Sequence, residues 1–261
     1  MNEFISENIQ DNILRVTLNN PSTQNTLSLD MIRRLQTVFE NADKNHDIKV
    51  IILASSGKVF CAGHNLKEIN NHRSDLDKGL DFFTILINSC SNLMLKIIHN
   101  SKPVIAEVNG VATAAGCQLV ASCDLAYAST NAKFATPGVN IGLFCSTPMV
   151  ALSRAVKNKH SMEMLLTGDL IKAEKAIEIG LINNIFINKD LTKEVNLIAE
   201  LISKKSSLTL KVGKKAFYEQ SGMKIVEAYK YASEVMIKNM MEAESEEGIS
   251  AFIEKRKPNW S

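Results

Sequence analysis

The sequence lacks the compositional biases that mark non-globular classes of protein. Its 261 residues include one Trp and 6% aromatic residues, with 45% hydrophobic and 22% charged residues. This is the profile of an ordinary globular protein, and it excludes a disordered, collagen-like or coiled-coil chain. A chain of this length can bury a sizeable core and still form a cleft, so it needs neither disulfides nor zinc for stability.

The chain also has little excess charge of either sign. Its 30 Lys and Arg residues and 28 Asp and Glu residues leave a formal net charge of +2. Proteins that bind nucleic acid usually carry a concentrated basic surface. We therefore expect no nucleic-acid partner, and any polyanion that binds should be small or recognised locally.

No apolar run predicts a membrane-spanning segment. The longest runs, such as VIILA at residues 50–54, have the length of a strand. The amino-terminal MNEFISENIQDN is acidic and polar, without the features of a signal or transit peptide. We expect no membrane partner and a cytoplasmic location, with the mitochondrial matrix as the alternative if a leader is removed.

Common cofactor and nucleophile motifs are absent too. The sequence has no G-x-G-x-x-G after a strand, no G-x-x-x-x-G-K-[ST], no H-E-x-x-H and no G-x-S-x-G, and its five histidines are scattered. We therefore expect no metal, no nucleotide hydride chemistry and no serine nucleophile. The cysteines form no C-x-x-C pair and are interpreted as free thiols of a reducing compartment: Cys61, Cys90, Cys117, Cys123 and Cys145.

Hydrophobic periodicity predicts an α/β core followed by a helical region. The alternating ILRVTL at 13–18 and the apolar runs at 50–54 and 103–108 are typical of strands. After residue 161 nearly every segment has a helical pattern, and only NNIFI is strand-like. We predict an α/β core over residues 1–195 and a helical region over 196–261 that share an interface, since no linker separates them.

Two segments share an unusual design, in which a buried strand leads into a turn of small residues. They are FCAGHNLKE at 60–68 and VNGVATAAGCQLV at 108–120. In the second, residues 113–116 would begin a helix, where unpaired N–H groups and the positive end of the helix dipole favour a developing negative charge. Tight packing of a helix on a sheet explains the same small residues on composition alone.

The order and spacing of these motifs resemble the enoyl-CoA hydratase/isomerase (crotonase) superfamily. The two segments are followed by CDLAYAS, AKFATPGVNIG, MEMLLTGDLIKAEKAIEIGLI and EEGISAFIEKRKP, so the resemblance runs from near Ile13 to the end. It implies a crotonase-like spiral of β-β-α units with two roughly perpendicular sheets and a helical carboxy-terminal region. It also implies a homotrimer or a hexamer made of two trimers.

The resemblance further implies an acyl-CoA thioester of fatty-acid metabolism as the substrate. Coenzyme A is then part of the substrate, and no separate cofactor is expected. The common step of the family is polarisation of the thioester carbonyl by two backbone N–H groups, which on this sequence belong to His64 and Ala115. Aligned donors of this kind are worth ~2.7–4 kcal/mol each in the barrier.

Residues that would bind coenzyme A follow from the same resemblance. The final helix of some family members reaches coenzyme A from a neighbouring subunit. On charge alone, the cationic end at 255–257 is equally well explained as a solvated helix terminus. The residues implied as contacts are Asn65, Leu66, Lys67, Phe252 and Lys255.

Two positions depart from the hydratases of the superfamily, which hold a water molecule between two glutamates. Gln118 stands in GCQL and Gly138 in TPGV, where the hydratases carry those glutamates. A glutamine can orient water but cannot cycle a proton near neutral pH, and glycine offers no group. General acid–base catalysis contributes ~10²–10⁴-fold, so we expect hydration of enoyl-CoA to be severely weakened or absent.

Three functions therefore remain open. The first is a reaction of an acyl-CoA thioester through the oxyanion hole, with weak hydratase activity. The second is another crotonase-type reaction, decarboxylation or thioester hydrolysis, that uses the imidazole of His64 with polar support from Gln118. The third is binding of acyl-CoA without catalysis.

Overall fold

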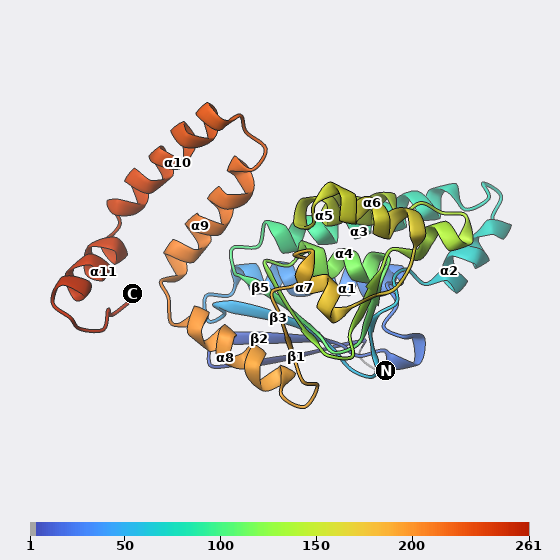
Figure 1. The fold of residues 1–261 in the computed structure, drawn as a ribbon, viewed down its shortest axis with the longest axis horizontal. Coiled ribbons are helices and arrows are strands. Elements are labelled where there is room, and N and C mark those ends of the chain that lie inside the picture. The colour runs from blue at the N-terminus through green and yellow to red at the C-terminus, as the bar shows by residue number, and fades with distance from the viewer. Residues whose placement is uncertain (1–3, 261) are drawn as a thin grey trace.

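The computed structural model describes residues 4–260, which fold into two β-sheets with helices packed around them (Figure 1). The six-stranded sheet has the order β1-β2-β3-β5-β7-β10, and all neighbours are parallel except β1 and β2. The four-stranded sheet has the order β4-β6-β8-β9, in which β9 is antiparallel to β8. The strands are β1 (Ile5–Gln10), β2 (Ile13–Leu18), β3 (Val50–Ser55), β4 (Val59–Cys61), β5 (Val104–Val108), β6 (Val111–Thr113), β7 (Leu125–Ser129), β8 (Lys133–Ala135), β9 (Ile171–Lys172) and β10 (Asn184–Phe186).

Three successive units of the chain repeat one arrangement. In the pairs β3–β4, β5–β6 and β7–β8, the first strand joins the six-stranded sheet, the second joins the four-stranded sheet, and a helix follows. This confirms the predicted spiral of β-β-α units. The helices are α1 (Leu29–Lys44), α2 (Leu66–Asn71), α3 (Leu80–Ile98), α4 (Ala115–Ser122), α5 (Ser146–Ala155), α6 (Asn158–Thr167), α7 (Ala173–Glu178), α8 (Leu191–Ser203), α9 (Ser207–Gln220), α10 (Ile225–Met240) and α11 (Ala243–Ile253), with short 3-10 helices η1 (Pro21–Thr23), η2 (His72–Ser74) and η3 (Pro137–Ile141).

Strand β3 divides the hydrophobic core into two parts. Successive side chains of a strand point to opposite faces of the sheet. Val50, Ile52 and Ala54 belong to the cluster that α8 completes on one face. Ile51 and Leu53 belong to the larger cluster, which includes buried residues of α1, α3 and α4. The VIILA run is therefore a strand covered on both faces, as predicted.

Two strands depart from the sequence prediction. Strand β1 has the sequence ISENIQ, and only Ile5 is buried, so the segment lacks the hydrophobic alternation of a half-buried strand. It forms because its backbone pairs antiparallel with β2 along the edge of the sheet. Strand β9 has only two residues, which is too short to carry a periodic pattern. Both strands depend on a partner that local sequence does not specify.

Helix α3 is the one helix of the described chain that is long and apolar enough to cross a membrane, judged by length and composition alone. Its residues Leu86, Cys90 and Leu93 are buried in the larger hydrophobic cluster. The helix packs along α1 and also contacts α4. Part of its apolar surface therefore serves the core of the protein.

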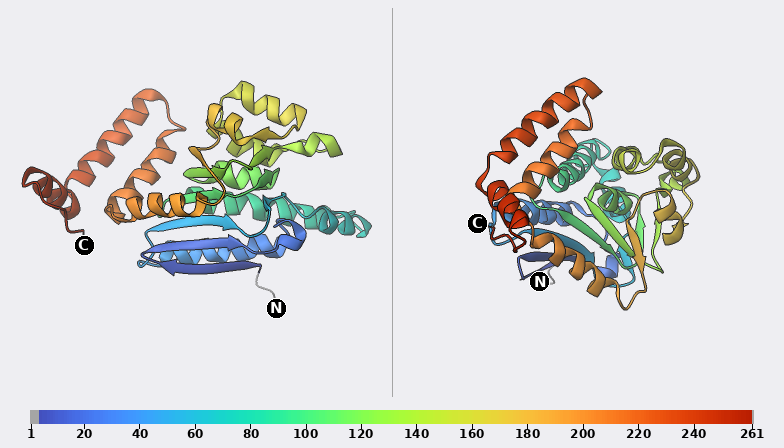
Figure 2. Two further views of the ribbon diagram at one scale, coloured as in Figure 1. Left: turned by 60° about the horizontal axis from the view of Figure 1, so that its bottom comes forward. Right: turned by 60° about the vertical axis from the view of Figure 1, so that its left-hand side comes forward.

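Helices α9, α10 and α11 form an arm that projects away from the two sheets (Figures 1 and 2). We call residues 207–253 the C-terminal arm. The apolar residues of α9 are all at least partly exposed, and α10 buries only Ala228. The boundary predicted at residue 195 lies inside α8, whose Leu191, Val195 and Ala199 pack on the sheet. Large apolar side chains are exposed along the arm: Phe217, Ile225, Val226, Tyr229, Met236, Ile237, Met240, Met241, Phe252 and Ile253.

We expect the replacement Ile52→Ala to lower the free energy of unfolding by ~2–5 kcal/mol, because it leaves a cavity between the sheet and α8. Ile9→Ala is the matched control, since Ile9 is 51% exposed on the edge strand β1. Denaturant unfolding of both variants measures the effect. Equal stability of the two variants would contradict the two-sided burial of β3.

Candidate active site

The first predicted segment forms a turn between β4 and α2. Gly63 has a φ of +89°, a left-handed conformation that glycine adopts without a steric penalty. Its carbonyl accepts a hydrogen bond from Leu27 N at 2.8 Å. Asn65 then caps α2, and its Oδ1 accepts from Lys67 N at 3.1 Å and Glu68 N at 3.3 Å. These bonds fix the path of the backbone on both sides of His64.

The second segment turns sharply from β6 into α4. Ala114 has a φ of 50° and a ψ of −118°, a conformation that costs a residue with a Cβ energy. The turn is held by a hydrogen bond of 2.9 Å from Ala114 N to Ala135 O. A Cβ on Gly116 would lie 2.1 Å from Cys61 O, so glycine is required there for α4 to approach β4. Tight packing therefore explains part of the small-residue run.

The two segments meet at Gly63. A Cβ on this residue would lie 2.9 Å from Ala114 Cβ and 3.4 Å from Ala115 N. Within residues 4–260, the amide N–H groups of His64 and Ala115 donate to no protein acceptor. The fold thus brings together the two residues that the sequence resemblance implied as donors, and leaves both N–H groups unpaired.

The imidazole of His64 is held in one tautomer. Its Nδ1 lies 3.3 Å from Leu27 O, and since a carbonyl only accepts, the proton sits on Nδ1. Its Nε2 is buried and has no hydrogen-bond partner. Burial lowers the pKa of His64, so the ring is neutral and carries an unshared lone pair on Nε2. Leu27, which the sequence did not single out, sets this state.

The two positions that lack a glutamate differ in their surroundings. Gln118 is 4% exposed, and its Oε1 is buried without a hydrogen-bond partner. A Cβ on Gly138 would lie 2.5 Å from Leu143 O and 2.9 Å from Cys145 Sγ, so this position has no room for a side chain. Burial also raises the pKa of Cys145, which keeps the thiol protonated and agrees with a buried apolar role.

The coenzyme A contacts implied in the first segment are accessible. Leu66 and Lys67 are exposed in the first turn of α2, and Lys67 has no ion pair within residues 4–260. Asn65 is partly exposed, and its side chain is used as the helix cap. Among the described residues, no group of three or more His, Cys, Asp or Glu side chains could hold a metal ion.

The implied contacts in the last helix lie elsewhere. Phe252 is 85% exposed on α11 and Lys255 follows that helix. In Figure 1 the C-terminal arm and α2 lie at opposite ends of the molecule. Arg256, next to Lys255, forms ion pairs of 2.6 Å with Glu247 and with Glu254. One chain therefore does not bring Phe252 and Lys255 to the site at His64 and Ala115.

The fold and the paired segments agree with the comparison to known families. The family described as "Enoyl-CoA hydratase/isomerase" matches residues 8–261. The chain belongs to the enoyl-CoA hydratase/isomerase family and has the crotonase fold.

Within this family, the chain is similar to the following individual proteins. The chain is 47% identical over 249 residues to enoyl-CoA hydratase domain-containing protein 3, mitochondrial, of Xenopus laevis, which covers 95% of this chain and 83% of that protein. The crystal structure of human enoyl-CoA hydratase domain-containing protein 3 matches with a TM-score of 0.94 and 43% identity, covering 99% of this chain and 100% of that one. An enoyl-CoA hydratase structure from Mycobacterium smegmatis matches with a TM-score of 0.94 and 41% identity, covering 99% of each chain.

We expect Gly138→Ala to lower the free energy of unfolding by ~1–3 kcal/mol, because the new methyl group overlaps the Leu143 carbonyl and the Cys145 thiol. Gly213→Ala is the control, since it lies inside α9 with no atom within 4 Å of the added Cβ. That change should raise stability by about 0.5–1 kcal/mol. Urea unfolding compares them, and a Gly138→Ala protein as stable as wild type would show that the 143–145 backbone yields freely.

Proposed function

We propose that the protein binds an acyl-CoA thioester of fatty-acid metabolism and polarises its carbonyl with the N–H groups of His64 and Ala115. The proposal rests mainly on one observation: these two N–H groups are unpaired, and they lie in two segments that touch at Gly63. Two fixed donors stabilise an enolate-like oxyanion without reorganisation during the reaction. Membership of the enoyl-CoA hydratase/isomerase family supports the thioester as ligand.

Standard enoyl-CoA hydration should be slow in this protein. Hydration needs one group that takes a proton from water and one that gives a proton to the substrate. Gln118 cannot ionise near neutral pH, and Gly138 has no side chain and no space for one. The two positions therefore supply no acid–base pair.

A second candidate function rests on His64. Its Nε2 is a buried acceptor on a neutral ring whose tautomer Leu27 O fixes. Such a nitrogen can take a proton from water, which suits thioester hydrolysis. In decarboxylation it would instead have to bring a proton to the enolate that remains after CO₂ is lost. The remaining alternative is an acyl-CoA-binding protein without turnover.

We also propose a homotrimer, alone or paired into a hexamer, in the mitochondrial matrix. The exposed apolar side chains of the C-terminal arm favour burial against other copies. Such an assembly also gives Phe252 and Lys255 a route to the coenzyme A of a neighbouring copy. The mitochondrial location replaces the cytoplasmic expectation because relatives at 45–47% identity are named mitochondrial.

Butyryl-CoA should bind more tightly than S-butyl-CoA, the thioether that lacks the carbonyl oxygen. Two hydrogen bonds to that oxygen are worth ~0.5–1.5 kcal/mol each, which together is roughly 5- to 160-fold in Kd. Isothermal titration calorimetry measures both ligands on the unaltered protein. Equal affinities would contradict the proposed oxyanion hole. If neither ligand binds, the proposed coenzyme A site is wrong.

His64→Ala separates the backbone role of this residue from its side-chain role. The variant keeps the amide N–H, so butyryl-CoA should still bind. If His64 is the base, hydrolysis of an acyl-CoA panel should fall by ~10²–10⁴-fold. His160→Ala, at a partly exposed position near Glu163, is the control and should match wild type.

Hydration of crotonyl-CoA tests the loss of the acid–base pair separately. Rapid hydration of this substrate by the wild-type protein would contradict that loss.

Lys255→Ala should weaken coenzyme A binding, and the loss should shrink as salt is raised, because a phosphate contact of an exposed lysine is screened. Lys238→Ala on α10 is the charge-matched control. Sedimentation should show a trimer or hexamer, since one chain does not bring Lys255 to the site. A monomer at micromolar concentration, or unchanged affinity at low salt, would make Lys255 a solvated helix-end residue.

A further inference from the structure

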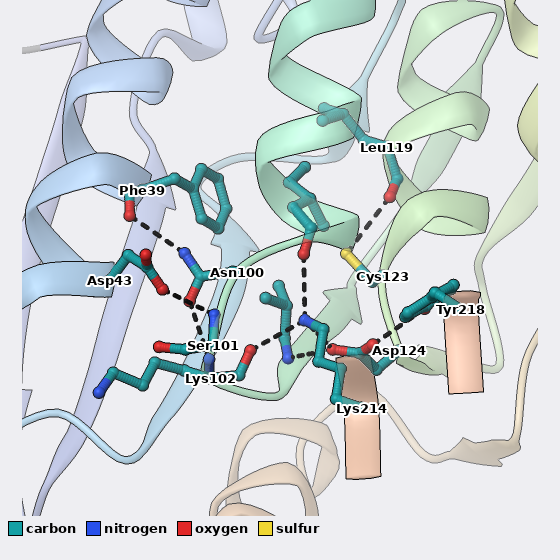
Figure 3. Close-up of polar contacts among 12 residues, drawn as sticks. Phe39, Asp43, Asn100, Ser101, Lys102, Leu119, Cys123, Asp124, Lys214 and Tyr218 are labelled. Atoms are coloured by element: carbon teal, nitrogen blue, oxygen red, sulfur yellow. Dashed lines mark hydrogen bonds and ion pairs between the residues drawn. The ribbon is translucent and has the colours of Figure 1, made fainter. Parts of the chain in front are cut away.

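A buried polar cluster joins the C-terminal arm to the core, away from the residues that would touch the thioester. It consists of Lys214 and Tyr218 on α9 and Asp124 between α4 and β7 (Figure 3). The side chain of Lys214 is 7% exposed and that of Asp124 is 19% exposed. Burying a charged pair is costly unless its hydrogen-bonding groups are satisfied, so the contacts of this cluster define what it does.

The ammonium group of Lys214 is completely satisfied. Its Nζ lies 2.7 Å from Asp124 Oδ2 and donates to Ile97 O at 3.0 Å and to Lys102 O at 2.9 Å. An ammonium has three N–H groups, which matches these three acceptors. Ile97 O belongs to the last turn of α3, where helix carbonyls lack partners within the helix. Lys214 thus ties α9 to two other segments besides Asp124.

Asp124 connects the arm to β5 of the six-stranded sheet. Its Oδ2 accepts from Val104 N at 2.7 Å, and its own N–H donates to Val104 O at 2.9 Å. Its Oδ1 accepts from the hydroxyl of Tyr218 at 2.9 Å. Burial and the neighbouring carboxylate raise the pKa of Tyr218, which keeps the hydroxyl protonated as a donor. Asp124 therefore holds the start of β5 and the arm at one point.

The loop that contains Lys102 is itself fixed to α1. Asn100 Nδ2 donates to Phe39 O at 3.0 Å, and Ser101 N donates to Asp43 Oδ1 at 2.6 Å. Figure 3 shows these bonds beside the contacts of Lys214. The ammonium is consequently bound to a loop that is anchored to the core on its other side.

Helix α4 connects this cluster to the candidate site. Asp124 follows the end of α4 by two residues, and the first residue of α4 is Ala115. The helix has eight residues, which is roughly 12 Å at 1.5 Å per residue. Seven of the eight are buried, so the helix has little freedom to bend independently of its ends. The helix is therefore a short, stiff connection along which a displacement at Asp124 would reach the N–H of Ala115.

We propose that Lys214 is a positioning residue that acts through Asp124 and α4 to hold the N–H of Ala115 in place. The proposal rests on the proposed function, in which Ala115 supplies one of the two oxyanion donors. It connects the attachment of the C-terminal arm at Lys214 with the geometry of the site in the same chain. Catalytic donors tolerate little displacement, because a shift of about 1 Å can cost on the order of 10²-fold in rate.

The test measures how strongly the protein stabilises an enolate, independently of any turnover. Acetoacetyl-CoA has an acidic CH₂ between two carbonyls, and two oxyanion donors should increase its ionised fraction when it is bound. The enolate is read from its near-UV absorption as a function of pH. In Lys214→Met the equilibrium constant for enolisation of the bound ligand should fall by roughly tenfold or more, since the donor is misplaced.

Two further variants make the comparison specific. Lys215→Met is the matched control, because its side chain is 71% exposed on the same helix, and it should keep the wild-type enolate fraction. Tyr218→Phe removes a single hydroxyl from Asp124 and should give a smaller decrease than Lys214→Met. Thermal unfolding and sedimentation of each variant establish that it is folded and assembled as wild type. If Lys214→Met does not fold, Tyr218→Phe decides the question.

The possible results separate the inference from the function on which it rests. Decreased enolate in folded Lys214→Met and Tyr218→Phe, with wild-type behaviour of Lys215→Met, supports the positioning role. Wild-type enolate fractions in the folded cluster variants would overturn it and leave Lys214 as an anchor of the arm only. If the wild-type protein binds acetoacetyl-CoA without increasing its enolate, the oxyanion hole itself fails, and the positioning role fails with it.

Discussion

The close approach of α4 to the end of β4 is the constraint on which the site depends. Gly116 lies against Cys61 O, where a Cβ would be only 2.1 Å from the oxygen. Because the two backbones can meet there, Gly63 lies against Ala114 and Ala115, and this brings the segment of His64 beside the first turn of α4. The small residues needed for packing therefore also position the two N–H groups proposed as donors.

Neither of the two positions at which hydratases of the superfamily carry a glutamate provides a carboxylate in this protein. At Gly138 the Leu143 carbonyl and the Cys145 thiol occupy the space into which a side chain would extend. At Gln118 a neutral amide is buried with an unpaired oxygen. Neither position therefore supplies a carboxylate for the proposed reaction of a thioester. The neutral imidazole of His64 carries a further unpaired acceptor, Nε2, in the other segment of the site.

The C-terminal arm combines an exposed apolar surface with polar attachments near its base. Besides Lys214 and Asp124, the indole of Trp260 donates to Lys204 O at 2.8 Å, which fastens the end of the chain to the connection between α8 and α9. Hydrogen bonds are directional, whereas apolar contacts are not, so such attachments set the orientation of the arm. Its apolar side chains remain exposed in the single chain.

Local pattern was sufficient for some elements and insufficient for others. The sequence alone determined the doubly buried strand at 50–54, the helical character of the carboxy-terminal region and, through the order of its motifs, the family and fold. Only the tertiary structure decided that the polar segment 5–10 is a strand, because its pairing with β2 replaces a hydrophobic signal. It also decided the tautomer of His64 and the partners of Lys214, since Leu27 O and the acceptors of the ammonium are far from them in sequence. Contacts between residues so far apart in sequence leave no local sequence pattern, and they form only when the chain has folded.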